Sequence, residues 1–506
     1  MYIGDYLGRR CVYTPEKVAL IAVSHTPARR YTYAQLNQRA ERLACWLREQ
    51  GVGKGDRVAM LAHDGIHFYD AFFACGKLGA IFAPLNWRLH SRELEEQLRL
   101  ITPRLLFHAR EEPMSSLVQQ WQGRPGLPAV IAFDAGATQW FPVPAGGVTP
   151  VTCETLTESD TACLLFTGGT TGRPKAAQIS HRQIVWNMIN SMLADVRGSD
   201  IFLNIFPLFH VGGLFAFSLP ILLQGGTVVQ TKKFEAGRTL ALIAQEHVTL
   251  FGGVPTVFQM LSEAPNWPAA DLTSLRYCMS GGAPMPVPLI RRYQQEKGVV
   301  FRQGFGMTEF GPGVFSLAAE DAERKAGSIG KPNFFVDAAI RAPADNTPLP
   351  PGKIGELVLR GPTAMTGYFG DPVATAAAFD ADGYFHTGDL AYVDDEGYFF
   401  IVDRLKDMFI SGGENVYPAE IEAALYRHPA VAQCAVIGVP DEKWGQVGRA
   451  FVVRKSGAAV TAEELLHFLR DQLAGYKVPR TIVFREHLPV SAAGKLLKSV
   501  LREESA

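Results

Sequence analysis

Residues 164–175 read Leu164-Leu165-Phe166-Thr167-Gly168-Gly169-Thr170-Thr171-Gly172-Arg173-Pro174-Lys175. This stretch predicts an apolar strand that runs into a loop rich in glycine and threonine and closed by a lysine. Glycines let backbone N–H groups approach anionic oxygens, and such concave loops bind phosphate. The loop is not a Walker A loop, because no Lys-Ser/Thr pair follows Gly172 at the required spacing. From the loop alone, a flexible surface turn is the alternative, since turns favour the same residues.

The composition of the chain narrows the classes of function. Its 49 basic and 50 acidic side chains give a net charge of −1, without the broad basic footprint of a nucleic-acid-binding protein. We therefore expect no nucleic-acid partner. The longest clean apolar run, Leu214 to Leu223, is far shorter than the roughly 20 residues that span a bilayer, so no integral membrane segment is expected. Scattered cysteines without a CxxC pair favour a reducing cytoplasm.

Length and periodicity predict an α/β protein. At roughly 150 residues per domain, the length suggests about three folding units. Residues 33–50 place apolar side chains on one helical face. Residues 58–61 are typical of a buried strand, and residues 71–83 of a helix packed on a sheet. Repeated alternation of this kind indicates layers of helices on sheets.

A fresh, compact α/β pattern follows Asp407. Pro418 predicts the start of one helix, and Thr461 with Glu464 forms a capping box for another, with Gly475 as its C-cap. About a hundred residues with this pattern can fold alone. We therefore place a domain boundary near residues 403–407. The strands predicted for this part cover residues 436–439 and 450–453.

Further short motifs follow the glycine-rich loop in order along the chain. They are Pro207-Leu208-Phe209-His210, Ser280-Gly281-Gly282-Ala283-Pro284, Gly304-Phe305-Gly306-Met307-Thr308-Glu309, Tyr384-Phe385-His386-Thr387-Gly388-Asp389, Asp403-Arg404-Leu405-Lys406-Asp407, Ser411-Gly412-Gly413-Glu414-Asn415 and Gly494-Lys495. The ordered set resembles the adenylate-forming superfamily, which comprises acyl-CoA synthetases, peptide-synthetase adenylation domains and beetle luciferases.

The resemblance implies a fold, an activity and a set of small-molecule partners. It implies a large N-terminal domain of layered sheets and helices over residues 1–403 and a small, mobile α+β domain over residues 404–506. It implies an ATP-dependent acyl-CoA synthetase with Mg²⁺ and coenzyme A. Such an enzyme joins a carboxylic acid to AMP with release of pyrophosphate, and then transfers the acyl group to the thiol of coenzyme A. The oligomeric state stays open, with a homodimer as one option.

Several residues match the family's phosphate and metal positions. Thr308 offers a hydroxyl to the α-phosphate, and Glu309 is a hard oxygen ligand of the kind that Mg²⁺ prefers. From this dipeptide alone, a helix N-cap followed by a solvated glutamate is the alternative. By resemblance, Lys495 bridges the substrate carboxylate and the α-phosphate, and His210 gates the acyl pocket. The phosphate-loop residues carried over are Thr167, Gly168, Gly169, Thr170, Thr171, Gly172 and Lys175.

The remaining assignments concern the nucleoside and coenzyme A. Asp389 would accept hydrogen bonds from the ribose hydroxyls, and Arg404 would donate to the same sugar. A simple turn is the alternative for the motif that contains Asp389. Lys406 is the expected hinge, and Trp444 is expected to stack on the adenine of coenzyme A. The small and aromatic residues predicted to line the adenine and the pantetheine tunnel are Gly281, Gly282, Ala283, Gly304, Phe305, Gly306, Gly412 and Gly413.

The class of acid is predicted from residues that are absent from one segment of the chain. No acidic residue occurs between Val211 and Leu223, where amino-acid-activating relatives carry an aspartate, and burying an unpaired ammonium is costly. An amino acid is therefore disfavoured, and fatty, aryl and phenylpropenoic acids remain. The alternatives are an adenylation enzyme that loads a carrier protein, a luciferase-like oxygenase and an inactive nucleotide sensor. Gly168 and Ala176 depart from the family's usual Ser and Gly, which predicts altered nucleotide affinity.

Overall fold

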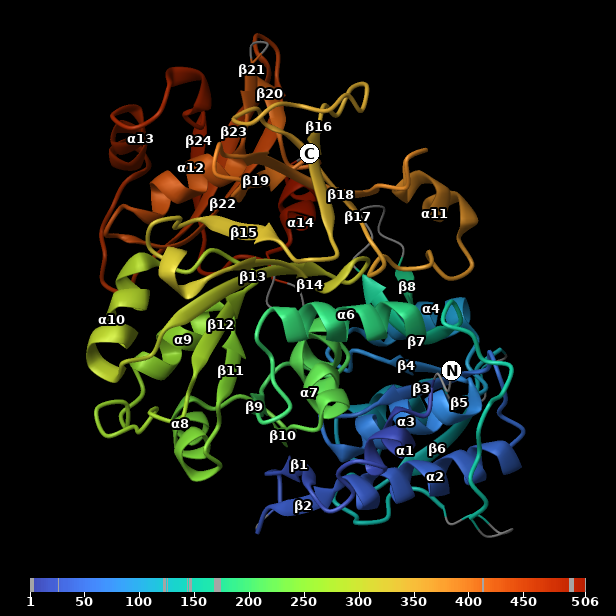
Figure 1. Ribbon diagram of the computed structural model, residues 1–506. Coiled ribbons are helices and arrows are strands. Elements are labelled where there is room, and N and C mark those ends of the chain that lie inside the picture. The colour runs from blue at the N-terminus through green and yellow to red at the C-terminus, as the bar shows by residue number, and fades with distance from the viewer. Residues whose placement is uncertain are drawn as a thin grey trace. The chain divides into compact units, whose positions relative to one another are not determined.

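The computed structural model describes residues 4–505 apart from 26, 122–123, 125, 143, 145–147, 168–173, 412–413 and 491–495. Two compact units make up the chain (Figure 1). Unit 1 comprises Met1–Ala338 and Leu359–Phe385, and unit 2 comprises Ala339–Val358 and His386–Ala506. Compactness does not define where a mobile domain begins, so the predicted boundary between residues 403 and 404 stays a prediction.

One sheet of unit 1 is parallel in its centre. Its strands run in the order β15-β14-β13-β12-β11-β9-β10-β1-β2, with β2, β14 and β15 antiparallel to their neighbours. The strands are β1 (Val18–Ala22), β2 (Arg29–Thr32), β9 (Ile201–Asn204), β10 (Thr227–Gln230), β11 (Leu250–Gly253), β12 (Tyr277–Gly281), β13 (Phe301–Met307), β14 (Gly311–Leu317) and β15 (Ser328–Pro332).

The second sheet of unit 1 has the order β6-β5-β3-β4-β7-β8. Its pairs are parallel except for β7 and β8, which run antiparallel. The parallel pairs require helical crossovers, which the alternating sequence pattern predicts. The strands are β3 (Arg57–Leu61), β4 (Ile81–Pro84), β5 (Leu105–Ala109), β6 (Ala129–Phe133), β7 (Thr161–Thr167) and β8 (Lys175–Ser180).

Helices cover these sheets, and α9 packs against β11 and contacts α8 and α10 (Figure 1). Phe258, Tyr293 and Phe301 meet in the core there. The helical elements of unit 1 are α1 (Tyr6–Cys11), α2 (Tyr33–Glu49), α3 (Ile66–Leu78), α4 (Ser91–Ile101), α5 (Met114–Gln119), α6 (His181–Leu193), the π-helix η1 (Gly212–Ser218), α7 (Leu219–Gln224), α8 (Ala236–Gln245), α9 (Pro255–Ser262), α10 (Val287–Lys297), the 3-10 helix η2 (Ala319–Asp321) and α11 (Pro372–Ala378).

The N-terminal predictions are confirmed in two places and wrong in one. The helix predicted at residues 33–50 is α2, which begins after a capping box formed by Thr32 and Gln35. The strand predicted at residues 58–61 is β3. The helix predicted over residues 71–83 is instead α3, which ends at Leu78 because Gly79 adopts a left-handed φ of 70°. Residues 81–84 form the buried strand β4.

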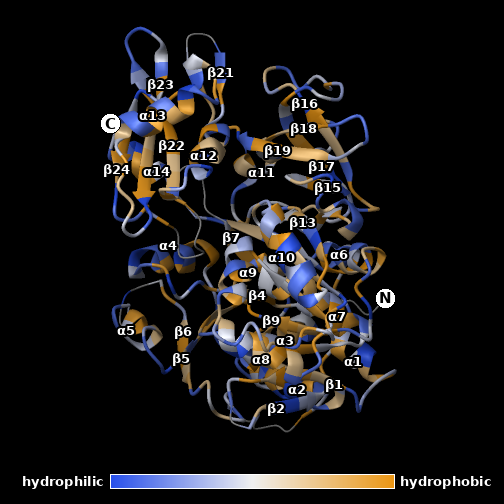
Figure 2. Cartoon of the chain, turned by 90° about the vertical axis from the view of Figure 1, so that its left-hand side faces the viewer, coloured by the Kyte–Doolittle hydropathy of each residue, from blue (hydrophilic) through white to orange (hydrophobic). Residues whose placement is uncertain are grey.

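Unit 2 contains two groups of strands, ordered β16-β17-β18-β19 and β21-β20-β23-β22, with β24 added in parallel to β23. Hydrophobic colour marks β22 and β24 in Figure 2, and the apolar core of the unit includes side chains from both strands. The elements are β16 (Asp337–Arg341), β17 (Gly355–Arg360), β18 (Phe385–Val393), β19 (Phe399–Arg404), β20 (Phe409–Ser411), β21 (Glu414–Val416), α12 (Pro418–Tyr426), β22 (Val431–Asp441), β23 (Gly445–Arg454), α13 (Ala462–Arg470), the 3-10 helix η3 (Gly475–Lys477), β24 (Thr481–Phe484) and α14 (Lys498–Glu503).

The C-terminal elements follow the sequence pattern closely. Pro418 is the first residue of α12, and the capping box of Thr461 and Glu464 begins α13. Gly475 is not the C-cap of α13, because that helix ends at Arg470 with a right-handed cap at Asp471. The predicted strands at 436–439 and 450–453 lie inside β22 and β23. Among the helices described, none is long and apolar enough to cross a bilayer.

Candidate active site

The hairpin between β13 and β14 carries Thr308 and Glu309. Both residues are half-buried and lie in the turn between the two strands, so the alternative of a helix N-cap does not hold. Gly306 lies just before the turn, and a Cβ atom there would come within 2.2 Å of the Pro312 carbonyl oxygen. A glycine is therefore required for the two strands to approach this closely, which fixes where the Thr308 and Glu309 side chains emerge.

Two of the predicted glycine motifs lie side by side. Gly281 at the end of β12 is the register partner of Gly304 in β13, and a Cβ at Gly281 would lie 3.1 Å from the Gly304 carbonyl oxygen. Gly282 has a φ of 80°, which favours glycine, and Ala283 is exposed. Phe305 is half-buried, with its ring centroid 5.8 Å from that of Phe315. Two motifs that are separate in the sequence therefore lie next to each other at one end of the sheet.

The strands that flank the glycine-rich loop form an antiparallel pair. Thr167 at the end of β7 is the register partner of Lys175 at the start of β8. The two predicted residues are therefore held opposite each other by the sheet. Five other predicted loop residues lie outside the residues that the structure describes, namely Gly168, Gly169, Thr170, Thr171 and Gly172.

Tyr368 links the β8 strand to the Glu309 hairpin, and the sequence reasoning missed it. Its hydroxyl donates to Glu309 Oε1 at 3.2 Å, and the Lys175 Nζ lies 4.9 Å from the centroid of its ring. Burial, followed by the charge of Glu309, raises the pKa of the Tyr368 phenol well above its usual value. The phenol is therefore a neutral donor over the physiological range. A tyrosine in a glycine-rich stretch near residue 368 offered no distinguishing signal in one sequence.

His210 lies in a turn that is held by hydrogen bonds before and after it. Its Nδ1 accepts from the Gly212 N–H at 3.2 Å, so the proton of the neutral ring resides on Nε2. The preceding Leu208 N–H donates to Asp64 Oδ1 at 2.8 Å. Burial raises the pKa of Asp64 to about 7, although the Leu208 N–H and the charge of Arg88 act in the opposite direction. Asp64 also lines a polar cavity of about 300 Å³, and the sequence reasoning did not single it out.

Within unit 2, Asp389 and Arg404 are brought together. They are register partners on β18 and β19, and Arg404 Nε lies 2.8 Å from Asp389 Oδ1. The Asp389 side chain is 5% exposed, whereas that of Arg404 is 48% exposed. The motif around Asp389 is part of a strand, with Gly388 at a φ of 69° within it, so a simple turn does not describe it. An Asp–Arg pair of this kind fixes the direction of the carboxylate.

The other predicted residues of unit 2 have varied surroundings. Lys406 is exposed in the turn between β19 and β20. Trp444 is 41% exposed in the connection between β22 and β23, with the Lys443 Nζ 4.9 Å from its ring centroid. Lys477, a further cation of this unit, contacts the Glu420 carboxylate at 2.7 Å. Three predictions, Gly412, Gly413 and Lys495, lie outside the described residues.

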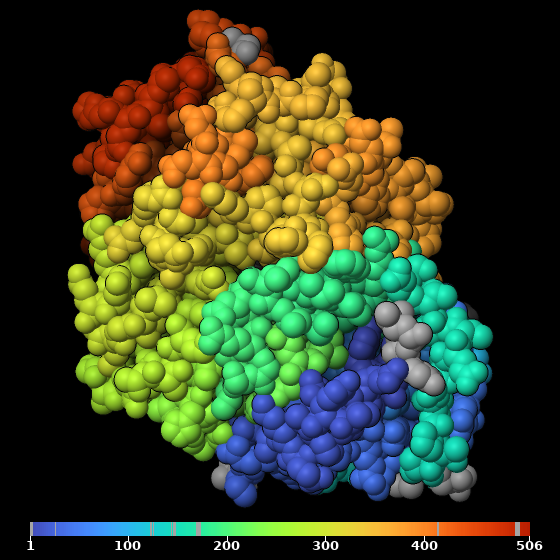
Figure 3. All heavy atoms as spheres, in the orientation of Figure 1, coloured from blue at the N-terminus to red at the C-terminus, as the bar shows by residue number. Residues whose placement is uncertain are grey.

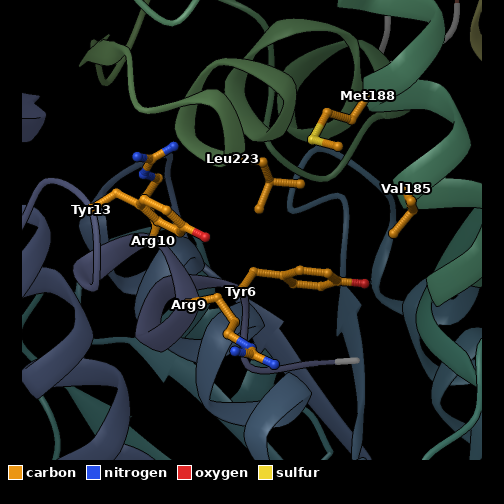
Figure 4. A pocket seen from close by; sticks show the side chains of 7 residues that line it. All are labelled: Tyr6, Arg9, Arg10, Tyr13, Val185, Met188 and Leu223. Atoms are coloured by element: carbon orange, nitrogen blue, oxygen red, sulfur yellow. The ribbon is translucent and has the colours of Figure 1, made fainter. Parts of the chain in front are cut away.

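A separate, mainly apolar cavity of about 190 Å³ lies between helices of unit 1 (Figure 4). Its lining comes from α1, α6 and α7 and the residues next to them. Figure 3 shows that the surface of the N-terminal segment, in blue, adjoins that of the segment coloured green. The lining residues are Tyr6, Arg9, Arg10, Tyr13, Val185, Met188 and Leu223. None of them is a predicted site residue, so this cavity is distinct from the candidate active site.

Comparison with known proteins decides the family. Residues 7–369 match the family described as AMP-binding enzyme, and residues 420–495 match the AMP-binding enzyme C-terminal domain. The chain belongs to the AMP-binding enzyme family. It is an AMP-forming acid–thiol ligase, and the predicted resemblance, fold class and enzyme class are confirmed. Synthesis of an acyl-CoA is favoured over the carrier-loading and sensor alternatives.

Curated relatives of this AMP-binding enzyme cover almost its whole length. It is 44% identical over 476 residues to a feruloyl-CoA synthase from an Amycolatopsis species, a match covering 93% of each chain. It is 37% identical to the indoleacetate–CoA ligase of Aromatoleum aromaticum, covering 99% of this chain and 98% of the relative. A long-chain-fatty-acid–CoA ligase of Mycobacterium tuberculosis is 36% identical over the same shares.

Solved structures also match the AMP-binding enzyme over almost its whole length. ATP-bound MatB from Rhodopseudomonas palustris is 30% identical with a TM-score of 0.89, covering 99% of both chains. The o-succinylbenzoate coenzyme A synthetase of Bacillus subtilis, in complex with ATP and magnesium ion, is 32% identical with a TM-score of 0.87. That match covers 98% of this chain and 99% of the other. The predicted large N-terminal and small C-terminal domains agree with these structures.

Proposed function

We propose that this enzyme uses ATP and Mg²⁺ to convert an aromatic carboxylic acid, of the phenylpropenoic class, into its coenzyme A thioester. The observation that supports the chemistry is the cluster of Lys175, Tyr368 and Glu309 beside the paired glycine motifs. It places a cation, a neutral donor and an anion within one unit, next to backbone without side chains. Such a set suits a metal-chelated triphosphate better than either charge alone.

The first half-reaction needs two anions to meet. A carboxylate oxygen of the acid attacks the α-phosphorus of ATP, and pyrophosphate leaves with the electrons of the broken P–O bond. Glu309 fits Mg²⁺, because its carboxylate is a hard oxygen ligand whose described partner is an uncharged hydroxyl. Bound Mg²⁺ supplies neutralisation of phosphate charge. Thr308 would donate to the α-phosphate, while Lys175 would offset the charge of the departing pyrophosphate.

The class of acid follows from the segment around the π-helix η1. Phe209 and Phe215 are buried there, and no acidic side chain occurs from Val211 to Leu223. An apolar aromatic body suits such a surface, whereas an α-ammonium group would lack a carboxylate partner. The 44% identity to a feruloyl-CoA synthase favours a phenylpropenoic acid over a fatty acid, for which the identity is 36%.

Residues of unit 2 would serve both half-reactions, and the second one transfers the acyl group. The thiol of coenzyme A attacks the acyl carbon, the C–O bond to AMP breaks, and AMP leaves. Asp389 and Arg404 would hold the ribose during the first step, and Trp444, exposed in its connection, would stack on the adenine of coenzyme A. Gly412 and Gly413 would line the pantetheine passage. Location in the cytoplasm remains a prediction.

An exchange assay with a panel of acids tests the proposal. Radioactive pyrophosphate should enter ATP when ferulate is present, and exchange with palmitate or phenylalanine should be at least about tenfold slower, which corresponds to about 1.4 kcal/mol of transition-state binding. Coenzyme A, but not a phosphopantetheinyl carrier protein, should then accept the acyl group. Exchange fastest with palmitate would contradict the aromatic class, and transfer only to the carrier would contradict the acceptor.

The role proposed for Lys495 separates the two half-reactions. Lys495→Ala should abolish formation of acyl-AMP while leaving the conversion of supplied acyl-AMP and coenzyme A to thioester. The reason is that a lysine bridging two anions matters only while those anions are being brought together. Equal loss of both steps would show that Lys495 does not act in the first step alone, and would remove the support for a small domain that changes position around Lys406.

A further inference from the structure

We propose that Tyr368 is a positioning residue for the phosphate and metal groups: it holds the Glu309 carboxylate through its hydroxyl and the Lys175 ammonium over its ring, and so keeps the two opposite charges from pairing with each other. The inference rests on the proposed function, because it assigns roles to Glu309 and Lys175 in binding Mg²⁺ and ATP. Tyr368 was not singled out by any sequence motif.

The backbone around Tyr368 is hydrogen-bonded both to β8 and to the β13–β14 hairpin. The Phe369 N–H donates to the Ala176 carbonyl oxygen at 2.8 Å, one residue beyond Lys175 on β8. On the other side, the Met365 N–H donates to the Glu309 carbonyl oxygen at 2.7 Å. One short segment therefore spans the distance between β8 and the β13–β14 hairpin. Tyr368 lies between the two attachment points.

The chain at Tyr368 has little freedom of its own. The Tyr368 N–H donates to Thr375 Oγ1 at 2.9 Å, and Thr375 Oγ1 also donates to the Asp371 carbonyl oxygen at 2.8 Å. Gly367 has a φ of 144°, and a Cβ there would come within 2.6 Å of the Thr375 side chain. The base of the tyrosine side chain is therefore fixed before its ring and hydroxyl make contacts, which is what a positioning role requires.

The two contacts of the Tyr368 side chain use different parts of it. The hydroxyl donates to Glu309 Oε1 at 3.2 Å, which orients the carboxylate without neutralising its charge. The ring face attracts the Lys175 ammonium, whose Nζ lies 4.9 Å from the centroid, by a cation–π interaction. A neutral aromatic spacer thus leaves a full negative charge for a metal and a full positive charge for phosphate.

Without the spacer, the simplest arrangement of a neighbouring lysine and glutamate is a direct ion pair. Such a pair would satisfy both charges within the protein, so that Mg²⁺ and phosphate would have to compete for them. Removing the hydroxyl alone should free the carboxylate to turn. Removing the ring should in addition let Lys175 reach Glu309. The two changes therefore have separable consequences.

The test compares Tyr368→Phe and Tyr368→Leu in the full-length enzyme. Binding of Mn²⁺, as a probe of the Mg²⁺ position, is followed by electron paramagnetic resonance with α,β-methylene-ATP present. Tyr368→Phe should weaken Mn²⁺ binding by about 3- to 10-fold, the range expected for the net contribution of one ordinary hydrogen bond. Metal-free nucleotide should bind it within about twofold of the wild type, since the cation–π contact is kept.

Tyr368→Leu should weaken Mn²⁺ binding more than Tyr368→Phe does, because Lys175 can then pair with Glu309. It should also weaken binding of metal-free nucleotide by about 2- to 5-fold, as expected when Lys175 loses the ring. Tyr293→Phe is the matched control, because it also removes a buried phenol hydrogen bond, to the Phe258 carbonyl oxygen at 2.8 Å, in the core of the same unit. It should leave both affinities unchanged.

Two results would overturn the proposal. One is wild-type Mn²⁺ affinity in Tyr368→Phe, and the other is an equal Mn²⁺ loss in Tyr293→Phe, which would reveal a general effect of a lost buried hydroxyl. Neither depends on which acid the enzyme activates. The proposed function fails in a different way, by an absence of acid-dependent pyrophosphate exchange in the wild-type enzyme, and the metal-binding comparison still decides the role of Tyr368 in that case.

Discussion

Glu309 in unit 1 and Asp389 in unit 2 are both predicted to serve the nucleotide, yet their partners differ in charge. Glu309 accepts from the neutral hydroxyl of Tyr368, whereas Asp389 is paired with the guanidinium of Arg404. Asp389 is almost fully buried, whereas Glu309 is half-buried in a hairpin turn. Each unit therefore holds a carboxylate in place by a different physical means.

The difference indicates what each carboxylate is suited to do. A carboxylate that keeps its charge uncompensated is ready for a cation, because binding Mg²⁺ does not require an existing ion pair to break. A carboxylate already paired with arginine is fixed in direction, and its remaining lone pairs suit uncharged donors such as ribose hydroxyls. The first should govern the rate of the chemical step, and the second should govern nucleotide affinity.

The largest effect is expected from Glu309→Gln. This change keeps the size of the side chain and its ability to accept from Tyr368, but removes the charge that a metal needs. We expect kcat of acid-dependent pyrophosphate exchange to fall by about 10²–10³-fold, as when one group that stabilises transition-state charge is lost. Steady-state kinetics at saturating ATP measures it. A variant that changes only KM for ATP would break the contrast with Asp389.

A smaller effect, in a different parameter, is expected from Asp389→Asn. The amide loses the charge-assisted bonds to the ribose and to Arg404, so KM for ATP should rise on the order of 10- to 100-fold. The value of kcat should change much less, since the ribose does not change charge during the reaction. Arg404→Gln is the companion variant, and the double variant shows whether the two residues act as one unit. Additive effects would mean that the pair is not a functional unit.

His181, at the start of α6, is another titratable residue with an uncharged partner, and we expect it to affect stability. His181 is almost fully buried, and its described side-chain partner is the neutral Tyr6 hydroxyl, 2.9 Å from Nδ1. Burial lowers its pKa from 6.5 to about 4. Because the pKa is lowered in the folded protein, the contribution of neutral His181 to the free energy of unfolding is fully present above pH 6.5. This contribution is lost as the pH falls toward 4.

At pH 5, this group should reduce the free energy of unfolding by about 2 kcal/mol relative to pH 7.5. Urea denaturation at both pH values measures the change. His181→Asn is expected to be less stable at pH 7.5, because a packed ring is removed, but its loss between pH 7.5 and pH 5 should be smaller by that amount. An equal pH dependence in both proteins would mean that His181 is not held neutral by its surroundings.

The smallest effect is expected from Trp444→Ala in unit 2. The indole is 41% exposed, so its removal should leave thermal stability nearly unchanged. Loss of stacking on an adenine at an exposed site should raise KM for coenzyme A by about 5-fold, near the lower end of the range for one base. Thioester formation from supplied acyl-AMP measures it. No change in KM would exclude Trp444 from the coenzyme A site.

Much of the fold could be predicted because periodicity and capping signals are local. The capping box at Thr461 and Glu464 and the proline at Pro418 mark helix starts that the structure confirms. The predicted helix over residues 71–83 was wrong because a continuous apolar run has no period that separates a buried helix from a buried strand. The local signal that separates the two elements is Gly79, whose left-handed conformation ends α3.

The site was predictable to the extent that its residues lie in ordered motifs. The pairing of Gly281 with Gly304, and of Asp389 with Arg404, joins motifs that are far apart in the chain and that the resemblance had already grouped. Tyr368 and Asp64 could not be found in this way, because their contacts are with residues far away in the sequence. A single sequence contains no measure of such long-range neighbours.

The π-helix η1 lies in the segment proposed to receive the acid. Its hydrogen bonds join residues five apart, where those of an α-helix join residues four apart. Such wide turns are rare and are frequently found at functional sites. Phe215 and Phe217 lie within it, on a separate element from the hairpin that carries Glu309. Under the proposed function, the choice of acid could therefore be altered at η1 without altering the residues proposed to bind Mg²⁺.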